Sequence, residues 1–119
     1  EHRTVIIFDE VDAGVGGAVA DAVGERLARL ARDAQVLVVT HSPQVAARAS
    51  AHWRIEKTQN DETTLTEVAA LSSQERVEEI ARMLSGARVT DEARAAARQL
   101  LGDSGNVIAA APRRRKKTA

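Results

Sequence analysis

Two adjacent carboxylates, Asp9 and Glu10, come directly after the apolar run of residues 5–8. Burying an unpaired charge is costly, so such a pair is expected where a cation or a reacting group meets it. A carboxylate at the end of a strand can orient Mg²⁺, commonly through water, and the next carboxylate can polarise a nucleophilic water. The pair is therefore a site hypothesis, and the chemistry it could serve is the binding of Mg²⁺ beside a phosphate and the activation of water.

A histidine follows a second apolar run. Residues 36–40, VLVVT, are rich in β-branched side chains and precede His41, while residues 18–33 carry apolar side chains at helical spacing. A strand, a helix and a strand in this order form a βαβ unit with parallel, neighbouring strands. Both strands then end at the edge of the sheet where ligands of α/β proteins gather. We expect Asp9, Glu10 and His41 to converge there, with His41 able to contact a terminal phosphate.

Each of these features also has a purely structural explanation. An Asp-Glu pair after an apolar strand often only caps a turn, and a lone loop histidine is more often satisfied by its neighbours than used in catalysis. Their joint placement favours a site. Ser42 lacks the Gly-x-Ser-x-Gly surroundings of a hydrolase nucleophile. His2 and His52 have no metal-ligand spacing to His41, so no zinc site is expected.

The sequence predicts two kinds of strand, one covered on both faces and two in an antiparallel hairpin. Residues 4–8 form a continuous apolar run, the pattern of a strand covered on both faces. After a short helix that Pro43 can start, residues 52–57 and 63–68 alternate in polarity around TQNDE. This pattern predicts an antiparallel hairpin, in which Trp53 serves as a packing residue.

Two helices are expected after the hairpin. Ser72 and Glu75 fit a capping box before an amphipathic helix, and Gly86 fits the end of that helix. Thr90 then caps a second helix, acidic in its first turn, that is predicted to run to Leu101. The capping residues thus set the boundaries of both helices.

Length and composition limit the fold. With 119 residues the chain is long enough for one small domain. Aromatic residues make up only 2%, so Ala, Val, Leu and Ile must fill a thin core. No cysteine is present, which excludes disulfides and thiolate chemistry. No run approaches a membrane span of about 20 apolar residues, and the amino terminus lacks a signal peptide's apolar segment, so we expect a cytoplasmic protein without membrane contact.

The charges are unevenly distributed. The net charge is zero, but residues 113–117, RRRKK, hold five of the 17 basic residues and leave 12 against 17 acidic residues elsewhere. We therefore divide the chain into a body, residues 1–102, and a disordered basic tail, residues 103–119. Such a tail can hold phosphate backbones, although basic carboxy-terminal runs are often only solvated ends.

Taken in order, these motifs resemble the second half of an ABC-type ATPase head. FDEVDAGVGG looks like a Walker B strand with its following loop, and VLVVTHSPQVAARA looks like a strand with its H-loop. With RVEEIARMLSG and VTDEARAAARQLL, the set resembles the carboxy-terminal end of the RecN family, bacterial DNA repair proteins related to SMC proteins. Walker B alone is a weak motif, but this ordered set of four is specific. The resemblance spans residues 4–101.

The resemblance implies a fold and a role for each matching residue. The fold is α/β, the carboxy-terminal lobe of a P-loop NTPase head of the ABC and SMC type, with a parallel βαβ unit, a β-hairpin and two helices. Asp9 is the Walker B aspartate, associated with Mg²⁺ through water, Glu10 is the general base, and His41 faces the γ-phosphate of ATP. The D-loop, at a dimer interface, supplies the other cofactor-binding positions: Asp12, Gly14, Gly16 and Gly17. Gly16 stands where the wider ABC pattern has an aspartate.

At full length, the resemblance implies an ATPase that binds and hydrolyses ATP at a dimer interface and acts in DNA double-strand break repair and recombination. The implied partners are DNA at break ends and a second copy of the chain, and a recombinase is a candidate partner. The expected location is cytoplasmic and nucleoid-associated. Two alternatives stay open: a non-catalytic dimerisation or DNA-binding module, and the head of another SMC or ABC-type ATPase.

The phosphate-binding part of an ATP site is missing from the sequence. No glycine is followed by lysine, so there is no Gly-x-x-x-x-Gly-Lys-Ser/Thr loop, and the chain is not expected to bind ATP alone. Because the chain starts just before Walker B, we expect a fragment. The strand over residues 36–40 should then expose a bare edge and apolar surface, and the isolated piece should be marginally stable or aggregation-prone.

Overall fold

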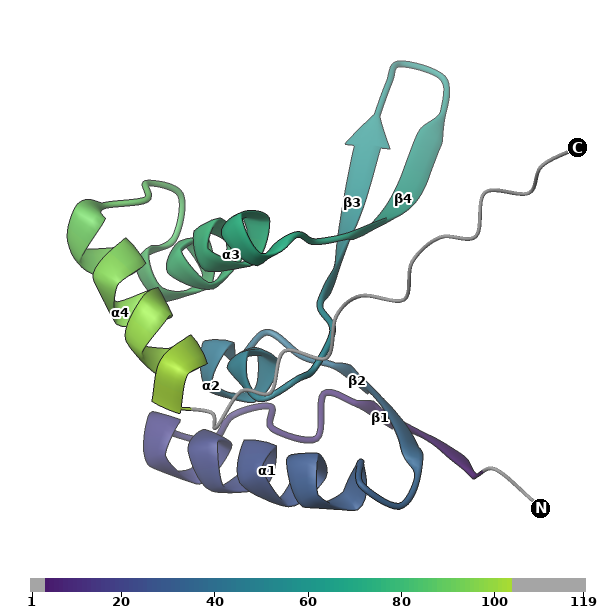
Figure 1. The fold of residues 1–119 in the computed structure, drawn as a ribbon. Helices are drawn as coiled ribbons and strands as arrows, with labels where there is room; N and C mark the ends of the chain where they lie inside the picture. Colours follow the sequence, from purple (N-terminus) through teal and green to yellow (C-terminus); the bar gives the residue numbers. More distant parts are fainter. Residues whose placement is uncertain (1–3, 104–119) are drawn as a thin grey trace, which may run out of the picture.

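The computed structural model describes residues 4–103, and its first part is a βαβ unit (Figure 1). β1 (Val5–Asp9) and β2 (Gln35–Val39) pair in parallel, in register from the first residue of each strand to the last. α1 (Gly17–Leu30) connects them. The predicted parallel, neighbouring strands are therefore confirmed, and both strands end at the same edge of the sheet.

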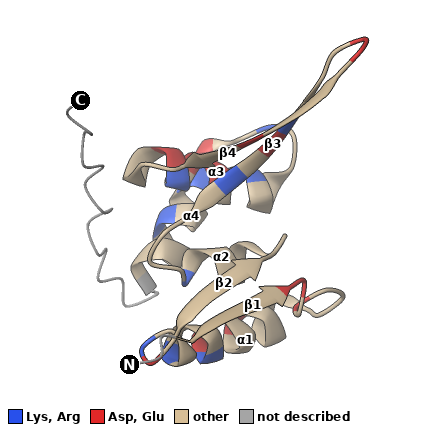
Figure 2. Ribbon diagram, turned by 90° about the vertical axis from the view of Figure 1, so that its right-hand side faces the viewer, with Lys and Arg blue, Asp and Glu red and all other residues tan. Residues whose placement is uncertain are grey.

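One face of this two-stranded sheet is open. α1 lies along the other face (Figures 1 and 2), and half-buried Ile6 and Phe8 alternate along β1 with exposed residues. Val5 and Ile7 are 51% and 68% exposed. The prediction that residues 4–8 are covered on both faces is thus wrong, because only one face has a helix against it in the described part of the chain.

β2 ends the sheet on its other side. Within residues 4–103 it pairs with β1 alone, so the predicted bare edge is present. Leu37 and Val39 lie on the face of β2 that stays exposed, as expected for an apolar surface without cover. Edges and apolar faces of this kind promote association, which is why the isolated chain is expected to aggregate readily.

The hairpin projects away from the rest of the fold (Figure 1). β3 (Trp53–Gln59) and β4 (Thr64–Ala70) pair antiparallel, as predicted. Trp53, Ile55 and Val68 share one face, because they occupy paired and alternating positions, and each is more than half exposed. Trp53 is therefore not a packing residue here, because none of the described helices covers this face.

The core lies among three helices and not on the sheet. α2 (Pro43–Ala47), α3 (Ser73–Ser85) and α4 (Asp91–Asp103) meet around small side chains. Ile80 is the largest fully buried side chain within the described residues. The remaining members of the core cluster are all alanines: Ala46, Ala47, Ala81, Ala93 and Ala97. The expected thin, aromatic-poor core is confirmed.

The predicted boundaries of the last two helices agree closely with the structure, whereas α1 ends at Leu30, three residues before the predicted end at residue 33. Ser72 and Glu75 form the reciprocal capping box of α3, and Gly86 ends that helix with a φ of 79°. The Thr90 side chain accepts a hydrogen bond from the backbone of Ala93 at the start of α4. α4 continues two residues beyond the predicted end, and residues 104–119, most of the predicted basic tail, lie outside the described part. None of the helices in residues 4–103 is long and apolar enough to cross a membrane.

Gly24 marks a close approach of α1 to α2. A Cβ at this position would lie 3.0 Å from Arg48 Cγ, 3.2 Å from Val45 Cα and 3.3 Å from the Gln44 carbonyl oxygen. Two of these atoms are backbone, so we expect Gly24→Ala to lower the free energy of unfolding by about 1–3 kcal/mol despite the better helix propensity of alanine. Gly102→Ala in α4, where a Cβ meets nothing within 4 Å, is the control and should be neutral or stabilising. Urea denaturation compares them, and a stabilised Gly24→Ala protein would contradict this packing.

Candidate active site at the carboxyl edge of the parallel strands

Glu10 and His41 meet where the two parallel strands end. The backbone amide of Glu10 donates to the Val39 carbonyl at 2.8 Å, which extends the strand pairing by one residue. Beyond this bond, Glu10 Oε1 lies 3.1 Å from His41 Nε2. Their side chains are 51% and 90% exposed, so both reach an open edge. The predicted convergence of these two residues is present in the structure.

Asp9 occupies the last position of β1, opposite Val39, and is exposed. Acidic residues mark this end of the strand in red in Figure 2. Within the described residues, no group of three or more His, Asp or Glu side chains forms a metal cage. A single exposed carboxylate fits Mg²⁺ that is held mainly by phosphate oxygens and water, which is the usual way this ion is bound in nucleotide sites.

Glu10 has a backbone conformation that the sequence did not indicate. Its φ is 52°, and within residues 4–103 it is the one non-glycine residue with positive φ. This left-handed region costs about 1–2 kcal/mol for an L-residue with a Cβ, and such residues concentrate at functional sites. The Ala13 amide donates a hydrogen bond of 3.0 Å to the Glu10 carbonyl, and this bond closes the turn that holds the conformation. The strain is placed at the residue predicted to be the general base.

Asp12 points into the protein and not toward the open edge. It is only 7% exposed, and its Oδ2 accepts a hydrogen bond of 2.5 Å from Thr40 Oγ1. The same Thr40 oxygen accepts a bond of 2.9 Å from the Ser42 amide. Ser42 in turn accepts from the Val45 amide and caps α2. The two loops of the site are therefore joined by a side-chain hydrogen bond, from Thr40 to Asp12, that sequence reasoning missed.

The glycines of the loop after Glu10 lie in open surroundings. Gly14 has a φ of 78°, which favours glycine, and a Cβ at Gly14 or Gly16 would meet no atom within 4 Å. Gly17 begins α1, where a Cβ would be in ordinary contact with Gln44 Nε2 at 3.4 Å. The first two glycines therefore leave space for another molecule to approach the backbone.

α2, which follows His41 directly, is fixed at its carboxyl end. Arg76, 7% exposed, reaches from α3, and its Nη2 donates to three carbonyl oxygens. These belong to Ala46, Ala47 and Ala49, at 2.9, 3.3 and 2.5 Å. A guanidinium at this place supplies donors to the carbonyls at the carboxyl end of a short helix, where the Ala46 carbonyl also accepts from the Ala49 amide at 3.2 Å.

Charged groups surround Arg76. Burial lowers the pKa of Arg76, and burial followed by the positive charge of Arg76 lowers the pKa of His52. Glu79, 5% exposed, is hydrogen bonded to Arg82, which lowers the pKa of that carboxyl despite burial. The lowered pKa values favour neutral His52 and ionised Glu79 in this cluster, and Arg76 is its contact with the end of α2.

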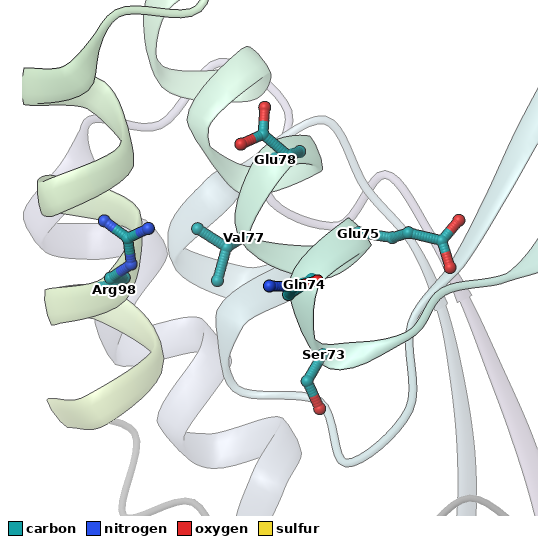
Figure 3. A pocket seen from close by; sticks show the side chains of 6 residues that line it. All are labelled: Ser73, Gln74, Glu75, Val77, Glu78 and Arg98. Carbon is teal, nitrogen blue, oxygen red and sulfur yellow. The ribbon is translucent and has the colours of Figure 1, made fainter.

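A groove on the opposite part of the fold contains none of the predicted site residues. It lies along α3 and is lined in part by Arg98 of α4 (Figure 3). Val77 points toward α4, while Glu75 points away from it (Figure 3). Five of its six lining residues are polar or charged, but none of them belongs to the predicted site at the carboxyl edge of β1 and β2.

Comparison with known proteins gives close sequence relatives. The chain is 54% identical over 96 residues to the DNA repair protein RecN of Rickettsia felis. It is 55% identical over 96 residues to RecN of Deinococcus radiodurans and 55% identical over 95 residues to RecN of Streptomyces coelicolor. The matches cover 81%, 81% and 80% of this chain but 18%, 17% and 17% of the relatives, so it spans under a fifth of their length. No family model matches the chain.

The fold has a relative among solved structures. A chain from work on the ATP-driven dimerization and DNA-stimulated activation of SMC ATPases superimposes with a TM-score of 0.55 at 19% identity. The match covers 71% of this chain and 50% of the other. At this identity the likeness concerns the fold, which agrees with the expected P-loop NTPase head. The chain is therefore RecN-like in sequence, with the fold of part of an SMC-type ATPase head.

Proposed function

We propose that this chain supplies the hydrolytic edge of an ATPase head that acts in DNA double-strand break repair and recombination as part of a RecN protein. One observation carries the proposal: Glu10 is held at a φ of 52° beside His41, at the carboxyl edge of two parallel strands. Identity of 54% to RecN favours this family over other SMC or ABC-type heads.

The two residues at the edge have complementary roles in the proposed reaction. Glu10 accepts the proton of the attacking water, which needs an ionised carboxylate that solvent can reach. His41 Nε2 lies 3.1 Å from the Glu10 carboxylate, and its proposed role is to face the γ-phosphate. Asp9 orients Mg²⁺ through water, and this ion, when bound, neutralises charge that develops on the phosphates.

Assembly is part of the proposal. The phosphate-cradling loop is not in these 119 residues, so other residues of the full-length protein hold the triphosphate. Gly14 and Gly16 face open space, which suits the approach of a second head at a dimer interface. DNA ends are the proposed substrate of the assembled protein, and a recombinase partner stays a prediction from the resemblance.

The first test concerns His41. In a RecN chimera, this chain replaces the 96 matching residues of Deinococcus radiodurans RecN. His41→Ala should lower kcat for ATP hydrolysis by about 10²-fold, the usual loss when a group that stabilises developing phosphate charge is removed.

His52→Gln is the matched histidine control, because His52 lies at the base of the hairpin and outside the edge. This variant should keep the turnover of the unsubstituted chimera per folded molecule, as measured by thermal unfolding alongside the assay. Unchanged turnover in His41→Ala would favour the non-catalytic module instead.

A further inference from the structure

Three polar groups connect the loop that carries Glu10 with the loop that carries His41. Asp12 lies two residues after Glu10, and Thr40 lies immediately before His41. Thr40 Oγ1 donates to Asp12 Oδ2 at 2.5 Å and accepts from the Ser42 amide at 2.9 Å. The chain of bonds therefore passes beside both residues of the site without including either.

This link is well placed to fix the two loops. The strand pairing ends with the bond from the Glu10 amide to the Val39 carbonyl, so it does not reach the His41 loop. The contact between Glu10 and His41 is exposed to solvent, where such pairs contribute little to structure. The Asp12 carboxylate, in contrast, is 7% exposed, and hydrogen bonds to a buried ionised group are strong.

The hydroxyl of Thr40 has two tasks that few side chains can combine. Its hydrogen is directed to Asp12, while its oxygen accepts from the backbone at the entrance to α2. Valine has nearly the same shape but can do neither, and serine can do both. The direction of the chain at His41 is therefore coupled to the position of the turn at Glu10.

We infer that Asp12 and Thr40 are positioning residues, which hold Glu10 and His41 in the arrangement needed for hydrolysis. The inference rests on the proposed function and refines it, since Asp12 then acts through Thr40 and not by contact with the nucleotide. Small displacements of positioned groups reduce turnover strongly while binding is retained. The effect of breaking the link should therefore fall on kcat.

The test uses Thr40→Val and Thr40→Ser in the RecN chimera. Thr40→Val should lower kcat for ATP hydrolysis by about 10–100-fold, with KM and nucleotide Kd nearly unchanged. Thr40→Ser should recover most of the lost turnover, which a loss of packing alone would not allow. Thr66→Val, an exposed threonine in β4, is the matched control and should behave as the unsubstituted chimera.

A double-mutant cycle then asks whether Asp12 and Thr40 act as one unit. Asp12→Ala combined with Thr40→Val should cost little more than either change alone, because both break the same bond. Glu10→Gln is measured in parallel, so that the two levels of the proposal can fail separately. If Glu10→Gln keeps full turnover, the proposed function fails and this inference fails with it.

If Glu10→Gln is inactive, four outcomes would overturn the positioning role alone. Thr40→Val could retain full kcat, Thr40→Ser could be as impaired as Thr40→Val, or the two single losses could multiply in the double variant. A fall in activity that follows only the fraction of unfolded protein would also overturn it. The proposal stands only if kcat falls in folded protein and the hydroxyl restores it.

Discussion

Glu10→Gln in the RecN chimera is expected to lower kcat for ATP hydrolysis by about 10²–10⁴-fold, the contribution of a general base. Glutamine has the shape of glutamate but cannot take a proton from water. Nucleotide Kd should stay close to the unsubstituted value, because the carboxylate is exposed at the edge and is assigned to the chemical step. Steady-state hydrolysis and equilibrium nucleotide binding measure the two effects.

Glu62→Gln provides the matched control for this change. Glu62 lies at the exposed tip of the hairpin, between β3 and β4, and far along the chain from the edge. The same loss of charge at that position should leave kcat unaltered. Equal activities of the Glu10→Gln and Glu62→Gln proteins would mean that Asp9 and Glu10 only end a strand.

Arg76→Met is expected to give the largest loss of stability. The change removes the charged donor to three carbonyl oxygens at the end of α2, of which that of Ala46 also accepts a backbone amide, from Ala49 at 3.2 Å. Hydrogen bonds to charged groups contribute about 1.5–3 kcal/mol, so we expect the free energy of unfolding to fall by at least that amount. Arg98→Met, at an exposed position of α4, is the matched control and should be nearly neutral. Urea denaturation of the two variants makes the comparison.

His52 reports on the same interaction through its titration. Burial and then the charge of Arg76 hold the pKa of His52 below its ordinary value of 6.5. A base whose pKa is lowered in the folded state stabilises the folded protein above pH 6.5, and this stabilisation is lost as the pH falls. In Arg76→Met, which lacks this charge, the pKa of His52 should rise. The loss of stability that His52 causes at acid pH should then become smaller. An unchanged His52 titration in Arg76→Met would contradict the influence of the Arg76 charge on the pKa of His52.

The sequence predicted the parts of the fold that depend on neighbouring residues. The capping box of Ser72 and Glu75 and the end of α3 at Gly86 involve only residues a few positions apart, and both predictions are confirmed. The parallel strands were also predictable, because a βαβ unit follows from the order of its elements. Convergence of Glu10 and His41 followed from that topology.

Features that depend on distant segments could not be predicted in this way. The prediction that residues 4–8 are covered on both faces was wrong, because the periodicity of a strand does not reveal which segments pack on it. Burial of Arg76 depends on how α3 packs against α2, and its position in an amphipathic helix gave no sign of this. The bond between Asp12 and Thr40 needs the exact turn after β1, including the positive φ of Glu10, which no residue type signals there.

The most direct test of the hydrolytic role is a single-turnover measurement, with the RecN chimera in excess over ATP and the reaction quenched at set times. We expect the unsubstituted chimera to convert the bound ATP to ADP, whereas Glu10→Gln should hold it uncleaved over many times that interval. Such a result would place Glu10 at the chemical step, since product release plays no part in it. Conversion at the unsubstituted rate by Glu10→Gln would mean that Glu10 is not the general base.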